Sequence, residues 1–316
     1  AIVALTNDKL IGARDPWGLR PLVLGEIDGA PVLCSETCAL DAIGASFVRN
    51  IEAGEVVVID RERVESLMPF PHVRATPCVF EYVYFARPDS FIDDISVYKT
   101  RHRFGIALAQ QWKAAGAPMP DAIIPVPDSS RDAAQACAAE LGVPYREGLV
   151  KNRYIGRTFI MPNQQARTSS IRRKLNPIPL EFDGKDVLLV DDSVVRGNTS
   201  RRIVDTARGA GARNVYLGVT SPPLVAPCPY GVDMASKREF IATDRTVDEI
   251  AESLGVDKLI YLDREAMNEA ARVGNPKITK FCNACFNGEY PTPDVTLDRL
   301  RKIEAEREEQ RDNVPV

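Results

Sequence analysis

The spacing of apolar residues changes near residue 72, and the change predicts two kinds of structure. Residues 1–72 hold short apolar runs between turn signals, and Asp28-Gly29 lies between two strand-like runs, as in a β-hairpin. Later in the chain, runs of strand length alternate with helical spacing. Buried strands are expected at 121–127, 186–192, 214–221 and 258–263. Such alternation favours an α/β fold with a parallel sheet flanked by helices.

The helices between these strands are indicated by period and by end signals. One is expected over Arg101–Ala115, one over Arg131–Leu141 up to Gly142, and one over about Thr199–Arg208. A further helix should begin after Thr246, whose hydroxyl suits the N-terminal cap. The densely charged stretch 297–312 predicts an exposed helix near the end of the chain.

Composition places the chain among ordinary globular proteins. Of the 316 residues, 45% are hydrophobic and 27% are charged. No apolar run approaches the about 20 residues that a membrane-spanning helix needs. The apolar opening meets Asp8 and Lys9 too early for a signal peptide, so we expect a cytoplasmic protein without a membrane partner. The net charge of -4 argues against general nucleic-acid binding, which needs a basic surface.

One segment departs from this average. Between Lys151 and Leu180 there is no acidic residue, and the basic residues are Lys151, Arg153, Arg157, Arg167, Arg172, Arg173 and Lys174. A basic segment in an acidic chain suits a small polyanion, although a solvated basic loop explains the charge equally well.

The stretch VLLVDDSVVRGNTS, Val187–Ser200, carries the strongest chemical signal. A buried strand ends at the acids Asp191 and Asp192, and a hydroxyl-rich glycine loop leads into a helix. In parallel sheets, ligands bind at the carboxyl ends of the strands. Backbone N–H groups around Gly197 and the helix N-terminus can cradle a phosphate. The acids can hold Mg²⁺ or accept hydrogen bonds from sugar hydroxyls.

This stretch resembles the phosphoribosyl-pyrophosphate motif of type I phosphoribosyltransferases. A second element agrees: IIPVPDSS, Ile123–Ser130, resembles the family's pyrophosphate loop, which holds pyrophosphate and its Mg²⁺. The resemblance implies Ser129, Asp191 and Asp192 on the magnesium side. The implied substrate-binding residues are Asp128, Ser129, Ser130, Asp191, Asp192, Ser193, Val195, Arg196, Gly197, Asn198 and Thr199.

Longer stretches narrow the resemblance. CVFEYVYFARPDS, GLVKNRYIGRTFIMP and SRRIVDTARGAGA are similar to the glutamine phosphoribosylpyrophosphate amidotransferases, which start purine synthesis. The resemblance implies three parts. Residues 1–72 correspond to the back part of a glutaminase domain of the N-terminal-nucleophile hydrolases, 73–295 to the phosphoribosyltransferase domain, and 296–316 to a charged helical tail.

The resemblance also implies a reaction. Ammonia displaces pyrophosphate from 5-phosphoribosyl 1-pyrophosphate and gives 5-phosphoribosylamine. The family's glutaminase nucleophile is an N-terminal cysteine, whereas residue 1 here is Ala1. We therefore expect this chain by itself to use ammonia and not glutamine.

Catalytic roles follow from the basic segment. KNRYIGRTF resembles the family's mobile loop, which closes over the sugar diphosphate and completes an ammonia passage. Cationic side chains there can stabilise the charge that builds on departing pyrophosphate, and closure excludes water. The residues implied are Lys151, Arg153, Tyr154 and Arg157.

The seven cysteines do not suggest a disulfide framework, because their number is odd and the chain is expected in the cytoplasm. Cys282 and Cys285 form a CxxC pair that alone is ambiguous among zinc, redox chemistry and chance. Some members of the family bind a [4Fe–4S] cluster through cysteines that match Cys78, Cys228, Cys282 and Cys285. The resemblance favours the cluster, with zinc second, since four thiolates suit both. Cys34, Cys38 and Cys137 fit packing roles.

Two other functions remain open at this point. A nucleobase phosphoribosyltransferase would use a base in place of ammonia, and a regulator would bind the sugar phosphate without catalysis. The family further implies a homo-oligomer, by analogy a tetramer, and purine nucleotides as feedback inhibitors.

Overall fold

The computed structural model describes residues 1–152, 175–232 and 237–312, and the side chains of this range up to residue 306. The chain forms two compact units. Unit 1 comprises residues 1–103 and 265–293, and unit 2 comprises 104–264 and 294–316. The division at residues 72 and 295 that the sequence suggested stays a prediction. In the described part of the chain, no helix has both the length and the apolar character of a membrane span.

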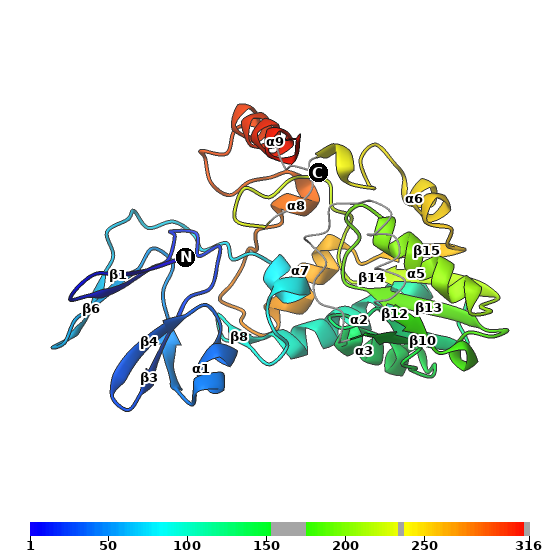
Figure 1. Ribbon diagram of the computed structural model, residues 1–316, viewed down its shortest axis with the longest axis horizontal. Coiled ribbons are helices and arrows are strands. Elements are labelled where there is room, and N and C mark those ends of the chain that lie inside the picture. Colours follow the sequence, from blue (N-terminus) through cyan, green and yellow to red (C-terminus); the bar gives the residue numbers. More distant parts are fainter. Residues whose placement is uncertain (153–174, 233–236, 313–316) are drawn as a thin grey trace. The chain divides into compact units, whose positions relative to one another are not determined.

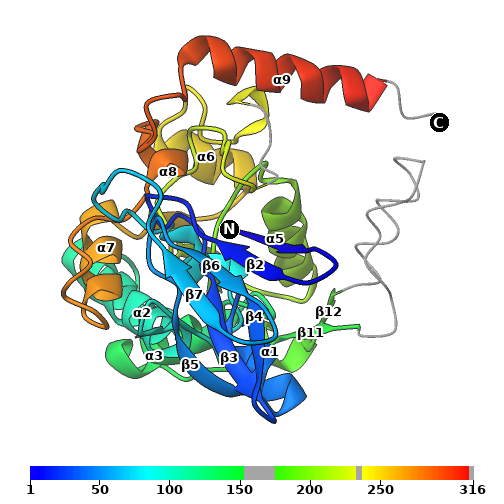
Figure 2. The ribbon, with the colours of Figure 1, turned by 90° about the vertical axis from the view of Figure 1, so that its left-hand side faces the viewer.

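Unit 1 is built mainly from antiparallel strands, as the sequence predicts for its first 72 residues. Its elements are β1 (Ile2–Leu5), β2 (Leu10–Ala13), β3 (Val23–Ile27), β4 (Ala30–Cys34), α1 (Thr37–Ile43), β5 (Ser46–Asn50), β6 (Val56–Ile59), β7 (Val64–Leu67), the π-helical turn η1 (Glu81–Phe85), β8 (Phe91–Ile92), β9 (Ile95–Ser96), α7 (Arg264–Arg272, from the boundary) and α8 (Ala284–Asn287). Two sheets, ordered β1-β2-β6-β7 and β4-β3-β5, are seen in Figure 2. The β3–β4 turn contains Asp28 and Gly29, both at positive φ, so the predicted hairpin is confirmed.

The two sheets of unit 1 share one core. Leu22, Leu24 and Ile51 pack with Val57 and Ile59 of β6. On its other face, β3 packs through Val23 against Leu40 of α1 and Ala45. The β4-β3-β5 sheet therefore lies between α1 and the β1-β2-β6-β7 sheet.

Unit 2 is organised by a parallel sheet in the order β10-β13-β14-β15. Its elements are β10 (Ala122–Pro125), α3 (Arg131–Leu141), β11 (Leu149–Lys151), β12 (Leu175–Pro177), η2 (Pro179–Glu181), β13 (Asp186–Asp191), α5 (Asn198–Gly209), β14 (Asn214–Val219), η3 (Lys237–Glu239), α6 (Val247–Leu254), β15 (Lys258–Tyr261) and α9 (Leu297–Asp312). The helix α2 (Val97–Ala114) starts in unit 1 and continues into unit 2. Most of these elements are labelled in Figure 1, and β11 is labelled in Figure 2.

Helices pack on both faces of this sheet, as the alternating pattern predicts. On one face, Ile203 of α5 and Ile250 of α6 join a core with Val187 and Leu189 of β13. On the other face, Trp112 of α2 lies 5.9 Å from Tyr216 of β14 between ring centroids. The fold prediction of a parallel sheet flanked by helices is confirmed.

Two helices show how local sequence sets their ends. α3 ends at Gly142, which adopts a left-handed conformation that suits a residue without Cβ. α6 starts after Thr246, whose hydroxyl accepts from the Glu249 N–H while the Glu249 carboxylate accepts from the Thr246 N–H. This reciprocal capping box satisfies N–H groups that the first turn leaves unpaired.

Candidate active site

Two loops of unit 2 meet at the carboxyl edge of the parallel sheet. β10 and β13 are neighbours, with Ile124 opposite Leu189, and the Val126 N–H donates to the Val190 carbonyl at 2.8 Å. The loops that follow these strands are therefore adjacent. One is the predicted pyrophosphate loop around Asp128, and the other begins with the acid pair Asp191–Asp192.

Hydroxyl groups join the two loops through the acids. The Ser129 hydroxyl donates to Asp192 Oδ2 in a short hydrogen bond, and the Ser193 hydroxyl donates to Asp192 Oδ1 at 2.7 Å. Ser130 Oγ lies 3.5 Å from Asp191 Oδ1, which also accepts from the Asp192 N–H at 2.9 Å. The structure thus brings together five residues that were predicted separately from two motifs.

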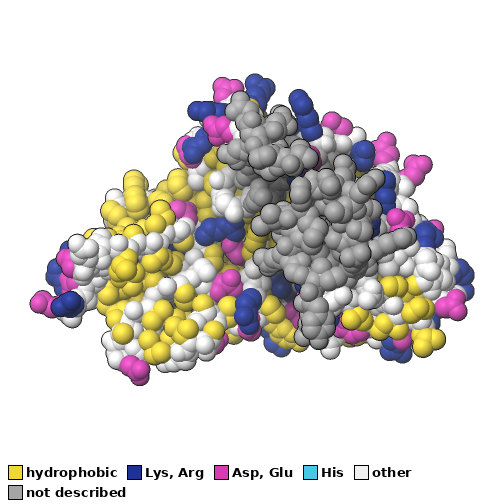
Figure 3. Space-filling view, viewed as in Figure 1, with side chains coloured by type: hydrophobic (Ala, Val, Ile, Leu, Met, Phe, Trp, Pro, Cys, Tyr) yellow, Lys and Arg dark blue, Asp and Glu magenta, His cyan; other side chains and the backbone are white. Residues whose placement is uncertain are grey.

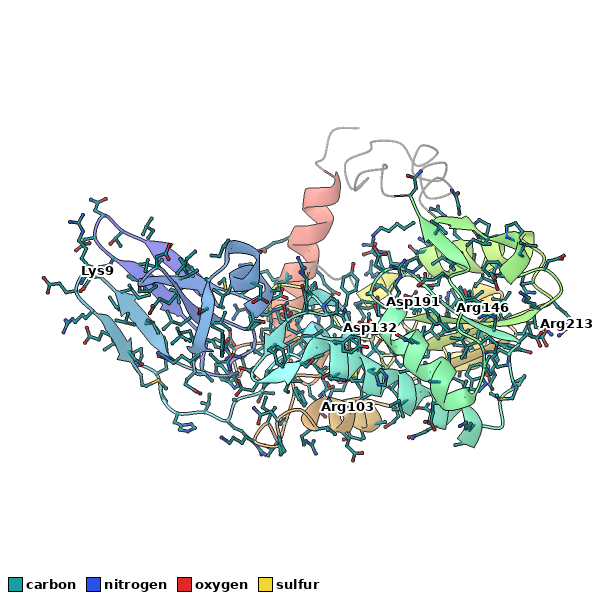
Figure 4. All side chains as sticks on the ribbon, turned by 90° about the horizontal axis from the view of Figure 1, so that it is seen from below. Lys9, Arg103, Asp132, Arg146, Asp191 and Arg213 are labelled. Atoms are coloured by element: carbon teal, nitrogen blue, oxygen red, sulfur yellow. The ribbon has the colours of Figure 1, made fainter. Side chains whose placement is uncertain are left out.

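The acid pair is buried, and burial disfavours the charged form of a carboxyl group. Asp191 is 8% exposed and Asp192 is 6% exposed. Burial, and then the charge of Asp192, raise the pKa of Asp191 well above its ordinary value. Figure 4 labels Asp191 among side chains around the sheet, with Arg213 at the opposite end of the strands. A cation beside this pair would offset the repulsion between the two carboxylates, and sugar hydroxyls could donate hydrogen bonds to them.

Lys151 reaches the pyrophosphate loop from the end of β11. Its Nζ lies 2.7 Å from Asp128 Oδ2. Arg131, at the start of α3, is 3.7 Å from Asp128 and 3.4 Å from Glu147. All these groups are substantially exposed, so water weakens their pairing. Lys151 is therefore positioned beside the pyrophosphate loop. Its ammonium group can leave the Asp128 carboxylate for a more highly charged anion.

The loop from Ser193 to Thr199, here called the phosphate loop, is the predicted phosphate cradle, and it turns into α5 at Gly197. Gly197 has φ 75°, and α5 begins at the next residue. A Cβ at this position would lie 2.3 Å from Ile241 Cδ1 and 3.1 Å from Leu254 Cδ2. Only glycine combines this backbone with this close contact. Arg196, Asn198 and Thr199 of the loop are exposed, and Val195 is half-buried.

Two residues near this loop were missed by the sequence reasoning. Glu239 forms an ion pair with Arg196, and the Ile241 N–H donates to the Val195 carbonyl at 2.9 Å. Both lie far beyond the motif that ends at Ser200, and Glu239 is 43 residues along the chain from Arg196. No periodicity or local motif indicates such a contact. Of the predicted catalytic residues, Arg153, Tyr154 and Arg157 lie outside the described residues.

The cysteines predicted as cluster ligands are distributed over both units. In unit 1, the main chains at Cys78 and Cys282 pair in an isolated parallel β-bridge, in which the Cys282 N–H donates to the Pro77 carbonyl at 2.8 Å. Cys285 follows on α8, and Cys228 belongs to unit 2. Among the residues that the structure describes, no three His, Cys, Asp or Glu side chains are grouped closely enough to hold a single metal ion.

Comparison with known proteins gives consistent relatives. Residues 105–249 match the phosphoribosyl transferase domain family. The chain is 49% identical to an amidophosphoribosyltransferase of Haemophilus influenzae, over 97% of this chain and 62% of that protein. It is 47% identical to the amidophosphoribosyltransferase of Archaeoglobus fulgidus, over 91% of this chain and 62% of that protein.

A solved structure is similar along most of the chain. Glutamine phosphoribosylpyrophosphate amidotransferase from B. subtilis, in complex with ADP and GMP, matches with a TM-score of 0.83 and 42% identity. The match covers 93% of this chain and 65% of that one. This chain therefore spans less than two thirds of the length of these relatives.

Proposed function

Because this chain belongs to the amidophosphoribosyltransferase family, we propose that it transfers the phosphoribosyl group of 5-phosphoribosyl 1-pyrophosphate to ammonia, the first step of purine synthesis. The nitrogen lone pair forms the new bond at ribose C1, the bond from C1 to the pyrophosphate oxygen breaks with its electron pair, and nitrogen loses a proton. The products are 5-phosphoribosylamine and pyrophosphate.

The observation that carries this proposal is the buried acid pair joined by hydroxyls to both loops. Ser129 donates to Asp192, so the pyrophosphate side and the ribose side of the site are held in one geometry. Such positioning is the main contribution that a protein makes to a displacement of this kind. Asp191 and Asp192 face the ribose hydroxyls in this proposal, and the loop 195–199 holds the 5′-phosphate. Lys151 stabilises charge on the departing pyrophosphate.

The acid pair also fits Mg²⁺. Magnesium prefers oxygen ligands and commonly binds one or two carboxylates together with substrate phosphates. Asp191, Asp192 and the Ser129 hydroxyl supply such oxygens, and the Ser129 hydroxyl already lies within hydrogen-bond distance of the Asp192 carboxylate. A bound ion there would neutralise charge on the leaving group.

The cysteine set fits an iron–sulfur cluster by its chemistry. A single ion needs all its ligands in one coordination sphere, whereas the four thiolates of a [4Fe–4S] cluster bind four different iron atoms. The bridge between Cys78 and Cys282 supports the cluster by placing two of the four predicted ligands on neighbouring backbones. We infer a structural [4Fe–4S] cluster on Cys78, Cys228, Cys282 and Cys285, with zinc as the alternative.

Unit 1 supports a role for glutamine in a fuller protein. Register places mostly apolar residues on the face of the β1-β2-β6-β7 sheet that points away from the Val57 core: Ile2, Ala4, Ile11, Ala13, Val56, Val58 and Leu67, with Glu65 as the charged member. Hydrophobic side chains gather over these strands in Figure 3. A sheet that faced water would alternate apolar and polar residues instead. We infer that this face is covered by the front part of a glutaminase domain.

Turnover separates the candidate functions. The purified chain, given phosphoribosyl pyrophosphate, Mg²⁺ and ammonium, should release pyrophosphate, and Asp191→Asn should abolish the release. Release with a nucleobase but not with ammonia would identify a nucleobase phosphoribosyltransferase. Binding without release would identify a regulator. Glutamine should replace ammonia only when the front segment of the Haemophilus influenzae relative is added as a separate chain.

Regulation and assembly are further parts of this proposal. The B. subtilis structure contains ADP and GMP, which supports purine nucleotides as feedback inhibitors of this chain. A homotetramer in the cytoplasm remains our proposal for its working state. Light scattering tests the assembly, and inhibition of ammonia-dependent turnover by these nucleotides tests the regulation.

A further inference from the structure

Arg196, in the middle of the phosphate loop, is engaged by an acid from a distant segment. Its Nε lies 3.1 Å from Glu239 Oε1, and its Nη2 donates to Glu239 Oε2 at 3.3 Å. This two-point arrangement fixes the orientation of the planar guanidinium as well as its position. The guanidinium is therefore already committed to a carboxylate within unit 2.

The same segment contacts the loop at two further places. The Ile241 N–H donates to the Val195 carbonyl at 2.9 Å, and the Ile241 side chain fills the space in which a Cβ of residue 197 would lie. Residues 239–241 thus touch three consecutive residues of the loop, Val195 to Gly197. One contact is ionic, one is a backbone hydrogen bond and one is apolar packing.

This segment is itself held at its start. The Thr243 hydroxyl donates to the Lys237 carbonyl at 2.6 Å, which closes the turn over residues 237–243. The Lys237 N–H donates to Glu304 of α9 at 2.8 Å. The loop is consequently connected through residues 237–243 to the C-terminal helix of the same unit.

We propose that the Arg196–Glu239 pair is a latch that positions the phosphate loop, and that Arg196 is a positioning residue and not a ligand of the 5′-phosphate. This inference rests on the proposed function, because it concerns binding of phosphoribosyl pyrophosphate. The paired charges cancel, so attraction of the phosphate comes from backbone N–H groups, loop hydroxyls and the start of α5. A loop that is ordered before binding loses less conformational entropy when the ligand arrives.

The test compares Glu239→Gln, Arg196→Gln and the exchange Arg196→Glu with Glu239→Arg. Each single variant should raise the KM for phosphoribosyl pyrophosphate about fivefold, as expected for an ion pair of about 1 kcal/mol, and leave kcat at saturation nearly unchanged. The exchange should recover most of the lost affinity. If Arg196 were a phosphate ligand, Glu239→Gln would release it and lower the KM, and the exchange would abolish binding. Either result overturns the proposal.

A matched control is Glu140→Gln, which removes the Lys113–Glu140 pair of similar exposure elsewhere in unit 2. It should leave the KM unchanged. Hydrogen exchange of residues 193–200 tests the latch without any substrate: exchange should be faster in Glu239→Gln and normal in the exchanged pair. Equal exchange in all variants overturns the latch. Failure of the unmodified chain to bind phosphoribosyl pyrophosphate would instead refute the proposed function.

Discussion

The Ser129 hydroxyl donates a hydrogen bond to the Asp192 carboxylate, across 63 residues of sequence. This contact joins the loop after β10 to the loop after β13 at the carboxyl edge of the parallel sheet. Because Asp192 also accepts from Ser193, this one carboxylate accepts a hydrogen bond from a hydroxyl of each loop. The geometry of both proposed half-sites thus depends on a single side chain.

Ser129→Ala should therefore weaken substrate binding as well as stability. A buried carboxylate that loses a hydrogen bond costs about 1–3 kcal/mol. We expect a lower free energy of unfolding and a higher KM for phosphoribosyl pyrophosphate. The control is Ser66→Ala, which removes a 2.6 Å hydrogen bond to the buried Glu55 carboxylate in unit 1. That variant should lose stability and keep its KM; an equal rise in KM for both would contradict a local role for Ser129.

Gly197→Ala should distort the phosphate loop. The left-handed backbone costs a residue with Cβ about 1–2 kcal/mol, and the new Cβ would push Ile241 and Leu254 out of place. Gly255 provides a matched control, since it has φ 74° but no atom within 4 Å of the same Cβ position. Gly255→Ala should carry the backbone cost alone. Urea unfolding and the KM for phosphoribosyl pyrophosphate should separate the two variants, with the KM raised only by Gly197→Ala.

Glu55 should give unit 1 a pH-dependent part of its stability. Burial alone would raise the pKa of this carboxyl, but hydrogen bonds from Arg49, Ser66 and the Glu52 N–H outweigh burial and lower it. A carboxyl whose pKa is lower in the folded state stabilises the fold above its unfolded pKa of about 4.3. That stabilisation is lost as the pH falls through the folded pKa.

Glu55→Gln should consequently lower the free energy of unfolding at pH 7, by about 1.5–3 kcal/mol for hydrogen bonds to a charged group. The difference from the unmodified chain should shrink as the pH falls below about 4. Urea unfolding at a series of pH values measures it. A constant difference at all pH values would refute the assignment to Glu55.

Much of the fold of unit 2 could be predicted because its signals are local. Buried strands of β-branched and leucine residues, glycine stops such as Gly142 and the Thr246 cap each depend on a few neighbouring residues. Helix α2 begins at Val97, four residues before the predicted start. Ser96 stands directly before this start, and its hydroxyl accepts from the Lys99 N–H at 3.3 Å, so a capping signal was present in the sequence and the prediction missed it. The end of a helix is the part that local signals define least well.

The candidate site likewise has parts that the sequence predicts and parts that it does not. The acid pair and the glycine loop could be predicted from one continuous motif, and the partnership of Ser129 with Asp192 could not, because it depends on which strands are neighbours. The Arg196–Glu239 pair is a still more distant contact. The sequence marked Arg196 as a substrate residue by its place in the motif, whereas its contacts support a positioning role.

Iron and sulfide content tests the cysteine proposal. Protein purified without air should contain about four irons and four sulfides per chain if Cys78, Cys228, Cys282 and Cys285 hold a [4Fe–4S] cluster. Cys282→Ser keeps the backbone bridge to Cys78, since that bridge uses only main-chain atoms. It should nevertheless lose most of the iron and, with it, thermal stability. Cys34→Ser, a half-buried change in the same unit, should keep the iron. Zinc without sulfide in the unmodified chain would exclude the cluster, because a tetrahedral zinc site uses the same thiolates and needs no sulfide.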